Sequence, residues 1–343
     1  MLISSQKLNP KIFDKDVEMQ PIRKGFGEGL LAAGEADERV VGLCADLTES
    51  TQMHLFKEKF PHRFVEIGVA EQNLATVASG MAAMGKIPFI SSYAMFSPGR
   101  NWEQIRTTIA YNNVPVKIAG SHAGVSVGPD GGSHQALEDI AMMRVMPRMV
   151  VLSPCDSIEA RKATIAAAKT NTPVYIRLAR DKTPVITTEE TPFEIGKASL
   201  LWEPHNLQGP TLYTRSDLVG RVGIIVTGSL VHEALKAARQ LEEIERVSVS
   251  VLNLATIKPL DVDAVVKLTK EAGAIVTVEE HQKMGGMGSA VAECLAGNCP
   301  VPIEFVAVDD QFGQSGTPSE LVAHYGLDAP HIVQAVRKVI SRK

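Results

Sequence analysis

A glutamate at the start of a predicted helix is the first residue of this chain whose type and position could do acid–base chemistry. Glu71 stands in the run FVEIGVAEQNLATVASG, where a short apolar strand ends and a helix of small residues begins. A carboxylate in the first turn of a helix often does no more than complement the positive end of the helix dipole. Taken alone, Glu71 therefore fits a structural role better than a catalytic one.

An aromatic loop follows the next predicted strand. The segment PFISSYAMFSPGRNW places Phe96 within, and Trp102 after, a Pro/Gly loop at the carboxyl end of that strand, where open α/β sheets bind their ligands. The two side chains could form a flat apolar wall against a bound ring. Packing in the core beneath the loop explains each of them equally well.

A glycine-rich loop carries the third group of candidates. Residues 119–139, AGSHAGVSVGPDGGSHQALED, hold five glycines, the histidines His122 and His134, and Asp130. Long polar loops inside compact domains are usually functional or disordered, and the helical pattern that begins at His134 argues against disorder. This loop is therefore predicted to be functional.

Alternating strands and helices must position these loops, and from Arg39 onward the pattern is that of βαβ units in a parallel sheet. The predicted strands are nearly all apolar, as expected where helices cover both faces of the sheet. We expect strands at 39–44, 63–68, 87–91, 115–119, 149–153 and 173–178. We expect helices between them at 71–84, 101–112, 134–143 and 156–170.

A second series of the same kind begins at Arg221, with the strand-like runs VGIIVTG, SVSVLNL, AIVTVEE and IEFVAV separated by helical patterns. Residues 185–220 contain few periodic apolar positions and the polar run EPHNLQGPTLYTRSD, which favours a linker. The sequence therefore predicts the α/β class, with one doubly wound domain at 19–184, this linker, and a second doubly wound domain at 221–343. Such an architecture hosts many functions, so only the loops indicate the chemistry.

Length and composition agree with a soluble protein of two domains. A chain of 343 residues exceeds the ~250 residues that a single core usually holds. Its 35 Lys and Arg balance 39 Asp and Glu without a block of like charge, which argues against nucleic acid or a membrane surface as a partner. The four cysteines form no CxxC pair, the N-terminus does not read as a signal peptide, and no apolar run approaches the ~18 residues of a membrane span. We therefore expect a cytoplasmic location.

The motifs taken together resemble the pyrimidine-binding domain of the transketolase family. The similarity rests on GVAEQNL with Glu71, the aromatic loop around Phe96, and GPDGGSHQ followed by ALEDIAMMRVMP. It continues through CADLTEST, IRLAR, VEEHQKMGGMGS and FGQSGTP, and so covers nearly the whole chain from about Met19. One such motif would be weak evidence, but their order makes the resemblance specific.

This resemblance implies a site for thiamine diphosphate. Glu71 would be catalytic, because a glutamate at this position of the family hydrogen-bonds N1′ of the cofactor's aminopyrimidine ring and shares a proton with it. The other positions that match cofactor contacts are Asp46, Leu47, Phe96 and Trp102. Where the family usually supplies a further aromatic residue, this sequence has Gly99.

The resemblance also implies a sugar phosphate as substrate. His134 would bind or exchange protons with substrate oxygens, which suits an imidazole near neutral pH. His122 and Asp130 would contact the sugar hydroxyls. The expected phosphate ligands are Arg23, Ser50 and Arg180, because two arginines that converge on one anion form charge-assisted contacts.

One part of a complete transketolase is missing from the sequence. The family binds the cofactor's diphosphate through a divalent metal held by a GDG-type loop with a downstream asparagine, and this chain has no such motif. We therefore expect no metal ligands here, and a separate N-terminal transketolase subunit that holds the diphosphate and Mg²⁺ or Ca²⁺. The resemblance suggests an α2β2 heterotetramer that transfers a two-carbon ketol unit from a ketose phosphate to an aldose or aldose phosphate.

Other functions remain open at this point. The β subunit of a 2-oxo acid dehydrogenase's decarboxylating component shares the glutamate and the two-domain plan, and a 1-deoxyxylulose-phosphate-synthase-like enzyme is similar around AEQ and DGxxHQ. A silent regulatory subunit is the non-enzymatic alternative, although it would have no physical need for Glu71, His122, Asp130 and His134. A dinucleotide-binding protein is disfavoured, because no GxGxxG opens a helix after a strand.

Overall fold

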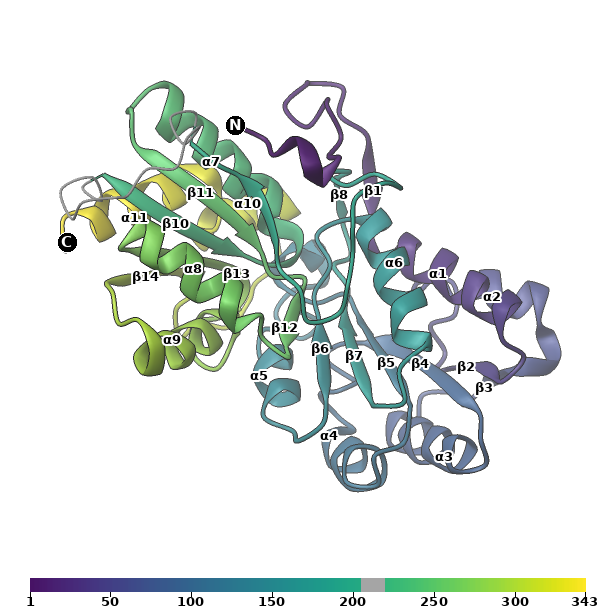
Figure 1. The fold of residues 1–343 in the computed structure, drawn as a ribbon. Coiled ribbons are helices and arrows are strands. Elements are labelled where there is room, and N and C mark those ends of the chain that lie inside the picture. The colour runs from purple at the N-terminus through teal and green to yellow at the C-terminus, as the bar shows by residue number, and fades with distance from the viewer. Residues whose placement is uncertain (205–219) are drawn as a thin grey trace.

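Two large β-sheets, each covered by helices on both faces, and one two-stranded ribbon organise the described part of the protein (Figure 1). The computed structural model describes residues 1–204 and 220–343. The predicted α/β class with two parallel units in series is confirmed. Within the described residues, no helix combines the length and the apolarity that a bilayer crossing requires.

The first sheet has seven strands in the order β12-β6-β7-β5-β4-β2-β3. Its six parallel strands are all among those predicted, and only their bounds differ by a few residues. They are β2 Val40–Cys44, β3 Phe64–Glu66, β4 Ile87–Tyr93, β5 Lys117–Ser121, β6 Val150–Leu152 and β7 Val174–Arg177. The seventh, β12 Thr256–Lys258, comes from the second half of the chain and pairs antiparallel with β6.

Helices cover both faces of this sheet. One face packs on α1 Ile22–Ala36, α2 His54–Lys59 and α6 Ser157–Ala168. Glycine lets α1 and α6 approach closely, because a Cβ on Gly25 would lie 1.7 Å from the Ser157 carbonyl oxygen. The other face packs on α3 Glu71–Ala83, α4 Trp102–Gln104 with its π-helical continuation Ile105–Ala110, and α5 Asp139–Arg144.

The predicted first residue of the helix at 134–143 is wrong. The α5 helix begins at Asp139, because the carbonyl groups just before it serve other partners. Ala136 accepts a hydrogen bond from the Gly124 amide at 2.9 Å, and Leu137 accepts one from the Gln282 amide at 2.8 Å. His134 therefore lies on a loop that is tied to both halves of the protein, not on a helix.

The second sheet has five strands in the order β14-β13-β10-β11-β9. Its parallel strands are β10 Arg221–Val226, β11 Ser248–Asn253, β13 Ile275–Gln282 and β14 Ile303–Val308. The antiparallel edge strand β9, Ser199–Trp202, lies inside the predicted linker 185–220, so this segment includes a strand of the second sheet. Residues 205–219 of the predicted linker fall outside the described part of the chain.

Five helices accompany the second sheet, and they are α7 Val231–Glu243, α8 Val262–Ala272, α9 Met287–Asn298, α10 Pro318–His324 and α11 Ala329–Ile340. Helices α7 and α11 pack on the face that is turned away from the first sheet. Residues of α8 and α9 join α3 and α5 in one continuous apolar core. This shared core and the exchanged strand β12 hold the two sheets in one packed body.

A short ribbon ties the ends of the first unit together. Strand β1, Met19–Pro21, pairs antiparallel with β8, Lys182–Pro184. Residues before this ribbon pack against the second unit, where Leu2 forms a bridge to Trp202.

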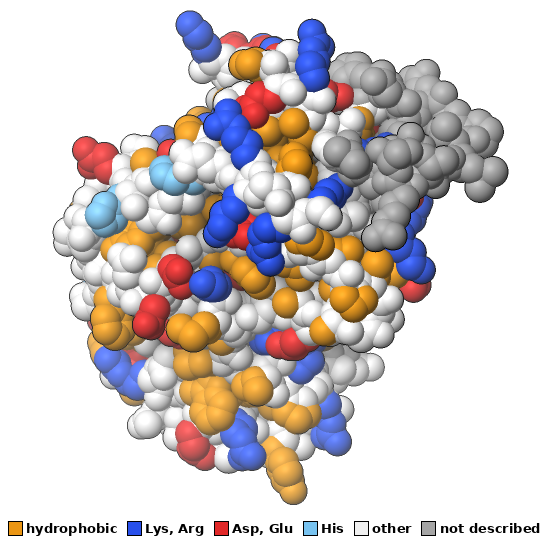
Figure 2. Space-filling model, turned by 90° about the vertical axis from the view of Figure 1, so that its left-hand side faces the viewer, with side chains coloured by type: hydrophobic (Ala, Val, Ile, Leu, Met, Phe, Trp, Pro, Cys, Tyr) orange, Lys and Arg blue, Asp and Glu red, His pale blue; other side chains and the backbone are white. Residues whose placement is uncertain are grey.

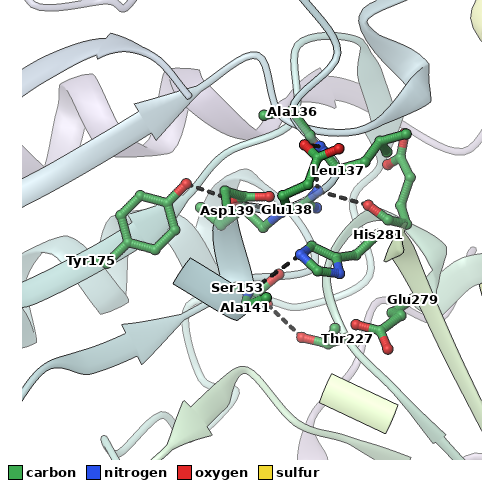
Figure 3. Close-up of polar contacts among 12 residues, drawn as sticks. Ala136, Leu137, Glu138, Asp139, Ala141, Ser153, Tyr175, Thr227, Glu279 and His281 are labelled. Atoms are coloured by element: carbon green, nitrogen blue, oxygen red, sulfur yellow. Dashed lines mark hydrogen bonds and ion pairs between the residues drawn. The ribbon is translucent and has the colours of Figure 1, made fainter. Parts of the chain in front are cut away.

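Buried polar contacts also cross the junction between the two sheets (Figure 3). The Tyr175 hydroxyl donates to Asp139 at 2.7 Å, and the Arg177 Nε donates to the same carboxylate oxygen at 2.9 Å. Arg177 Nη2 then donates to the backbone oxygen of Glu280 in the second unit at 2.7 Å. The Thr227 hydroxyl donates to the Ser153 carbonyl at 3.3 Å. Polar groups in this junction therefore specify how the two units meet.

Candidate active site

The candidate residues lie at the carboxyl edge of the first sheet. Because β7, β5, β4 and β2 are adjacent and parallel, the loops that follow them meet at one edge. Strand β2 leads to Ser50, β4 to Phe96, β5 to His122 and β7 to Arg180. Residues that are far apart in sequence are thus brought to one place by the strand order.

Glu71 is buried at the start of α3, with 2% of its surface exposed. Its Oε2 accepts a hydrogen bond from Arg100 Nη1 at 2.7 Å, and its backbone oxygen accepts one from the Asn101 side-chain amide at 2.8 Å. The Arg100 guanidinium also lies 5.0 Å from the centre of the Phe96 ring. Glu71 is therefore joined to the aromatic loop that the sequence suggested as its neighbour.

Sequence reasoning missed Arg100. It is the only charged residue between Ser91 and Trp102, in a loop already suspected of binding a ring. A single charged residue in an otherwise uncharged loop was the sequence feature that could have identified Arg100 as a site residue. Its pairing with a residue 29 positions earlier depends on the tertiary fold.

Four rings form a continuous cluster beside this pair. Tyr93, which sequence reasoning also missed, stacks on His122 with ring centres 3.8 Å apart and lies 6.1 Å from Phe96. His134 meets the edge of Phe96 at 5.4 Å and that of Tyr93 at 6.1 Å. The two predicted imidazoles thus lie against the aromatic loop, and Tyr93 connects them.

The backbone around Gly99 explains why no aromatic residue stands there. A Cβ at Gly99 would lie 2.0 Å from the Met95 carbonyl oxygen, so this loop has no room for a side chain at that position. Tyr93 and Phe96 supply the aromatic surface instead.

Trp102 does not join the ring cluster. Its indole Nε1 donates to the Met142 carbonyl at 3.0 Å, and the residue lines a cavity of about 720 Å³ with Tyr111 and Val145. The reason is its place at the start of α4, which packs toward α5 and not toward the carboxyl edge of the sheet. The expectation that Trp102 contacts the cofactor has no support in this geometry.

Arg23 contacts both Ser50 and His122. Arg23 Nη1 donates to the Ser50 carbonyl at 3.0 Å and lies 3.0 Å from His122 Nε2. Because a guanidinium has no acceptor, His122 Nε2 accepts this bond, and its Nδ1–H faces the Ser121 hydroxyl at 2.9 Å. His122 is therefore a neutral imidazole of defined tautomer.

The charges around His122 are positive. Burial first, and then the nearby Arg23, Arg180 and His134, lower the pKa of His122 to about 3. Burial and then Arg180 lower the pKa of Arg23, whose buried Nε has no hydrogen-bond partner in the described part of the chain. A desolvated arginine with an unused donor and a second arginine beside it form a site that an anion would complete.

The remaining predicted residues sit at the margin of the cluster. Asp46 is exposed with φ 58°, and its amide donates to Glu66 at 2.7 Å, so Glu66 positions this turn. Leu47 packs on the core formed by α1. Asp130 is exposed and makes no side-chain hydrogen bond within the described ranges. The fold places these residues near the site's loops but does not show them converging on it.

The residues present fit the aminopyrimidine end of thiamine diphosphate. A buried carboxylate beside aromatic rings suits a planar heterocycle with a ring nitrogen that can be protonated. The described residues contain no group of three or more His, Cys, Asp or Glu that could hold a metal ion. Glu71 and Phe96 are the residues that would hold the aminopyrimidine ring.

Two family models match the chain in sequence. The model for the transketolase pyrimidine binding domain matches residues 18–185, and the model for the transketolase C-terminal domain matches residues 219–332.

Two relatives and one solved structure match over nearly their whole length. A putative transketolase C-terminal section of Methanocaldococcus jannaschii is 41% identical over 94% of this chain and 97% of its own. The 6-deoxy-6-sulfo-D-fructose transketolase subunit of Clostridium sp. (strain MSTE9) is 39% identical over 96% of this chain and 98% of its own. A solved structure described as a split gene transketolase, inactive β4 tetramer, has 40% identity and a TM-score of 0.83, and the match covers 94% of this chain and 98% of that one.

Proposed function

This chain belongs to the transketolase family, and from that premise we propose that it is the pyrimidine-binding subunit of a heteromeric, thiamine-diphosphate-dependent transketolase. The enzyme would transfer a two-carbon ketol unit from a ketose phosphate to an aldose or aldose phosphate. The relatives that match over their full length carry the names of transketolase sections or subunits, which supports this proposal.

One observation carries the proposal. The buried carboxylate of Glu71 is linked through Arg100 to Phe96, and the ring cluster continues from Phe96 to His134 and His122. An acid–base group, an aromatic surface and two imidazoles therefore lie together at the carboxyl edge of a parallel sheet. A silent subunit would have no physical reason to bury this carboxylate among them.

The residues divide the work by their chemistry. Glu71 would hold the aminopyrimidine ring and share a proton with its N1′ nitrogen, and Phe96 would provide an apolar surface beside the ring. Bound thiamine diphosphate would supply the nucleophilic carbon and the electron sink that ketol transfer requires. His134, half-buried beside Phe96, would exchange a proton or a hydrogen bond with substrate oxygens.

The cationic end of the site would bind the substrate phosphate. Arg23 has an unused Nε donor, and Arg180 lies close enough to lower its pKa, so an anion between them would relieve their repulsion. Ser50 lies on the same side, with its carbonyl already bonded to Arg23. Neutral His122, whose Nε2 accepts from Arg23, would orient this guanidinium without adding charge. Asp130 would accept bonds from sugar hydroxyls once substrate fills the loop.

A partner subunit would complete the enzyme. The diphosphate and Mg²⁺ or Ca²⁺ would be held by an N-terminal transketolase subunit in an α2β2 assembly in the cytoplasm. Figure 2 shows the left-hand side of the molecule as it is seen in Figure 1. Hydrophobic side chains gather in the lower half of this face. Tyr111 and Val145, which are 78% and 69% exposed, flank the cavity that Trp102 lines. Apolar surface of this kind is typical of a protein interface.

The test is reconstitution. The chain would be purified with a diphosphate-binding transketolase subunit from the same genome and assayed with ketose phosphates, thiamine diphosphate and Mg²⁺. We expect activity of the complex and none of either subunit. Pyruvate decarboxylation with a lipoyl acceptor would identify a 2-oxo acid dehydrogenase component instead, and condensation of pyruvate with an aldose phosphate would identify the synthase-like alternative.

The same complex tests the role of Glu71. We expect Glu71→Gln to lower kcat by about 10²–10⁴-fold, the usual contribution of a positioned acid–base group. Glu103→Gln, a change of the same type at an exposed position of α4, should leave kcat within about twofold. Wild-type turnover by Glu71→Gln would disprove the assignment, and full activity of the chain alone would disprove the split organisation.

A further inference from the structure

Arg100 occupies the space in which the proposed function would seat the aminopyrimidine ring. Its Nη1 donates to Glu71 Oε2 at 2.7 Å, and its guanidinium carbon lies 5.0 Å from the centre of the Phe96 ring. These are the two contacts expected of the ring itself, namely a hydrogen bond to the buried carboxylate and a position over the aromatic surface. A ring that bonded the same Oε2 from the same position over Phe96 would have to displace the guanidinium.

The guanidinium resembles the ring in the properties that matter here. It is planar, it presents N–H donors at its edge, and it stacks readily on aromatic faces. A buried carboxylate without a partner is costly, so the free chain gains stability from a donor that satisfies Glu71. Arg100 provides this donor from within the same chain.

The side chain of Arg100 is also free to leave. It is 50% exposed, whereas Glu71 is 2% exposed, so an outward rotation would carry the guanidinium into solvent and leave Glu71 in place. No other hydrogen bond or ion pair holds its side chain within the described residues. Asn101, the next residue, keeps its own bonds to the Glu71 backbone and to the Ser97 hydroxyl. The loop would therefore stay in position while this one side chain moves.

We propose that Arg100 is a placeholder, which occupies the pyrimidine subsite of the free chain and turns out into solvent when the aminopyrimidine ring binds Glu71. This inference rests on the proposed function, because it assumes that Glu71 and Phe96 hold the ring. It assigns Arg100 a positioning role in which it competes with the cofactor. A permanent cofactor ligand would behave in the opposite way when removed.

The direction of the binding change distinguishes these roles. The substitution Arg100→Met keeps an unbranched apolar side chain over Phe96 but removes the donor. We expect the free full-length chain to bind thiamine about fivefold more tightly after this change, measured by isothermal titration calorimetry, because the competing state is lost. In the reconstituted complex, the apparent Kd for thiamine diphosphate should fall by a similar factor.

A conservative variant and a matched control sharpen the test. Arg100→Lys retains a cation that can reach Glu71 and should return the affinity toward the wild-type value. Arg239 lies in the second unit, donates to Glu243 at 2.9 Å and has its guanidinium 4.9 Å from the Phe13 ring. Arg239→Met therefore removes the same kind of arginine–glutamate–phenylalanine contact at a distant position. It should change neither the affinity of the free chain for thiamine nor that of the complex for thiamine diphosphate.

A stability cycle supplies a readout that does not involve the cofactor. In the free chain, Arg100→Met should lower the midpoint of thermal unfolding, because Glu71 loses its partner. When Arg100→Met is made in the Glu71→Gln variant, it should lower the midpoint of thermal unfolding by measurably less than it does in the wild type. If Arg100→Met lowers the midpoint equally in the wild type and in Glu71→Gln, the two side chains do not stabilise each other. That result would contradict the proposed placeholder role of Arg100.

The other outcomes separate this inference from the proposed function. If Arg100→Met weakens or does not change cofactor binding while the complex remains active and Glu71-dependent, the placeholder is wrong and the proposed function stands. If no variant of the complex responds to thiamine diphosphate and Glu71→Gln leaves its chemistry unchanged, both are wrong. Tighter binding by Arg100→Met, reversed by Arg100→Lys, would establish the placeholder.

Discussion

Arg177 offers the sharpest test of how the two halves of this protein are held together. Its side chain is 4% exposed and its ion-pair partner Asp139 is fully buried. Arg177 also donates to the carbonyls of Ala136 and Glu280, which lie on the loop that carries His134 and on strand β13. One guanidinium therefore joins the sheet, the candidate site and the second unit.

The expected effect of Arg177→Met follows from burial. Removing one partner of a buried ion pair costs about 3–5 kcal/mol, because the other charge stays buried without compensation. Here Asp139 would keep only the Tyr175 hydroxyl, and its Oδ1 has no hydrogen-bond partner in the described part of the chain. With an unfolding entropy of about 2.1 cal/mol/K per residue over 343 residues, this loss lowers Tm by about 4–7 °C.

Calorimetry of the purified chain measures this shift. Adding Asp139→Asn to Arg177→Met should recover part of the loss, because the uncompensated charge is then gone. Arg239→Met is the matched surface control, since that pair is 44% and 56% exposed and contributes about 0.3–0.5 kcal/mol. A Tm within about 1 °C of the wild type for Arg177→Met would refute the reasoning that this pair joins the two units.

Two further predictions concern the cationic end of the site. The pKa of His122 is about 3 in the folded chain and 6.5 in its reference state, so below pH 6.5 the unfolded chain binds a proton that the folded chain does not. Folding stability from this group is therefore lost as pH falls, by about 2 kcal/mol at pH 5. His122→Gln should remove that part of the difference between the free energies of unfolding at pH 8 and pH 5, and an unchanged difference would contradict the low pKa of His122. Arg180→Ala should raise KM for a ketose phosphate by about 10-fold or more, because a charged contact to the phosphate is lost. It should change KM for the unphosphorylated ketose and the Kd for thiamine diphosphate by less than about twofold. Equal effects on both sugars would rule out a phosphate contact.

Local patterns were enough to predict the six parallel strands of the first sheet and the start of α3. The apolar runs at 87–91 and 173–178 are short and bounded by turn residues, so their conformation depends mainly on their own side chains. The same locality placed Glu71 in the first turn of its helix. Motif order then identified the family, which the comparisons confirm.

Non-local contacts decided what local patterns could not. The helix expected from His134 starts at Asp139, because the Ala136 and Leu137 carbonyls bond to residues elsewhere in the fold. Strand β12 joins the first sheet although its sequence belongs to the second series. These outcomes depend on partners that lie up to about half the chain away, and no local pattern encodes them.

The candidate site divides in the same way. By itself the sequence determined which residue types stand at the ends of the strands, because strand ends and loop composition are local properties. Only the tertiary structure decided that Arg100 meets Glu71 across 29 positions, that Tyr93 stacks on His122, and that Trp102 packs toward α5. The physical reason is that side-chain partners are selected by burial and hydrogen bonding in the folded protein. There, the order of strands in the sheet, and not the order of residues in the chain, decides which side chains are neighbours.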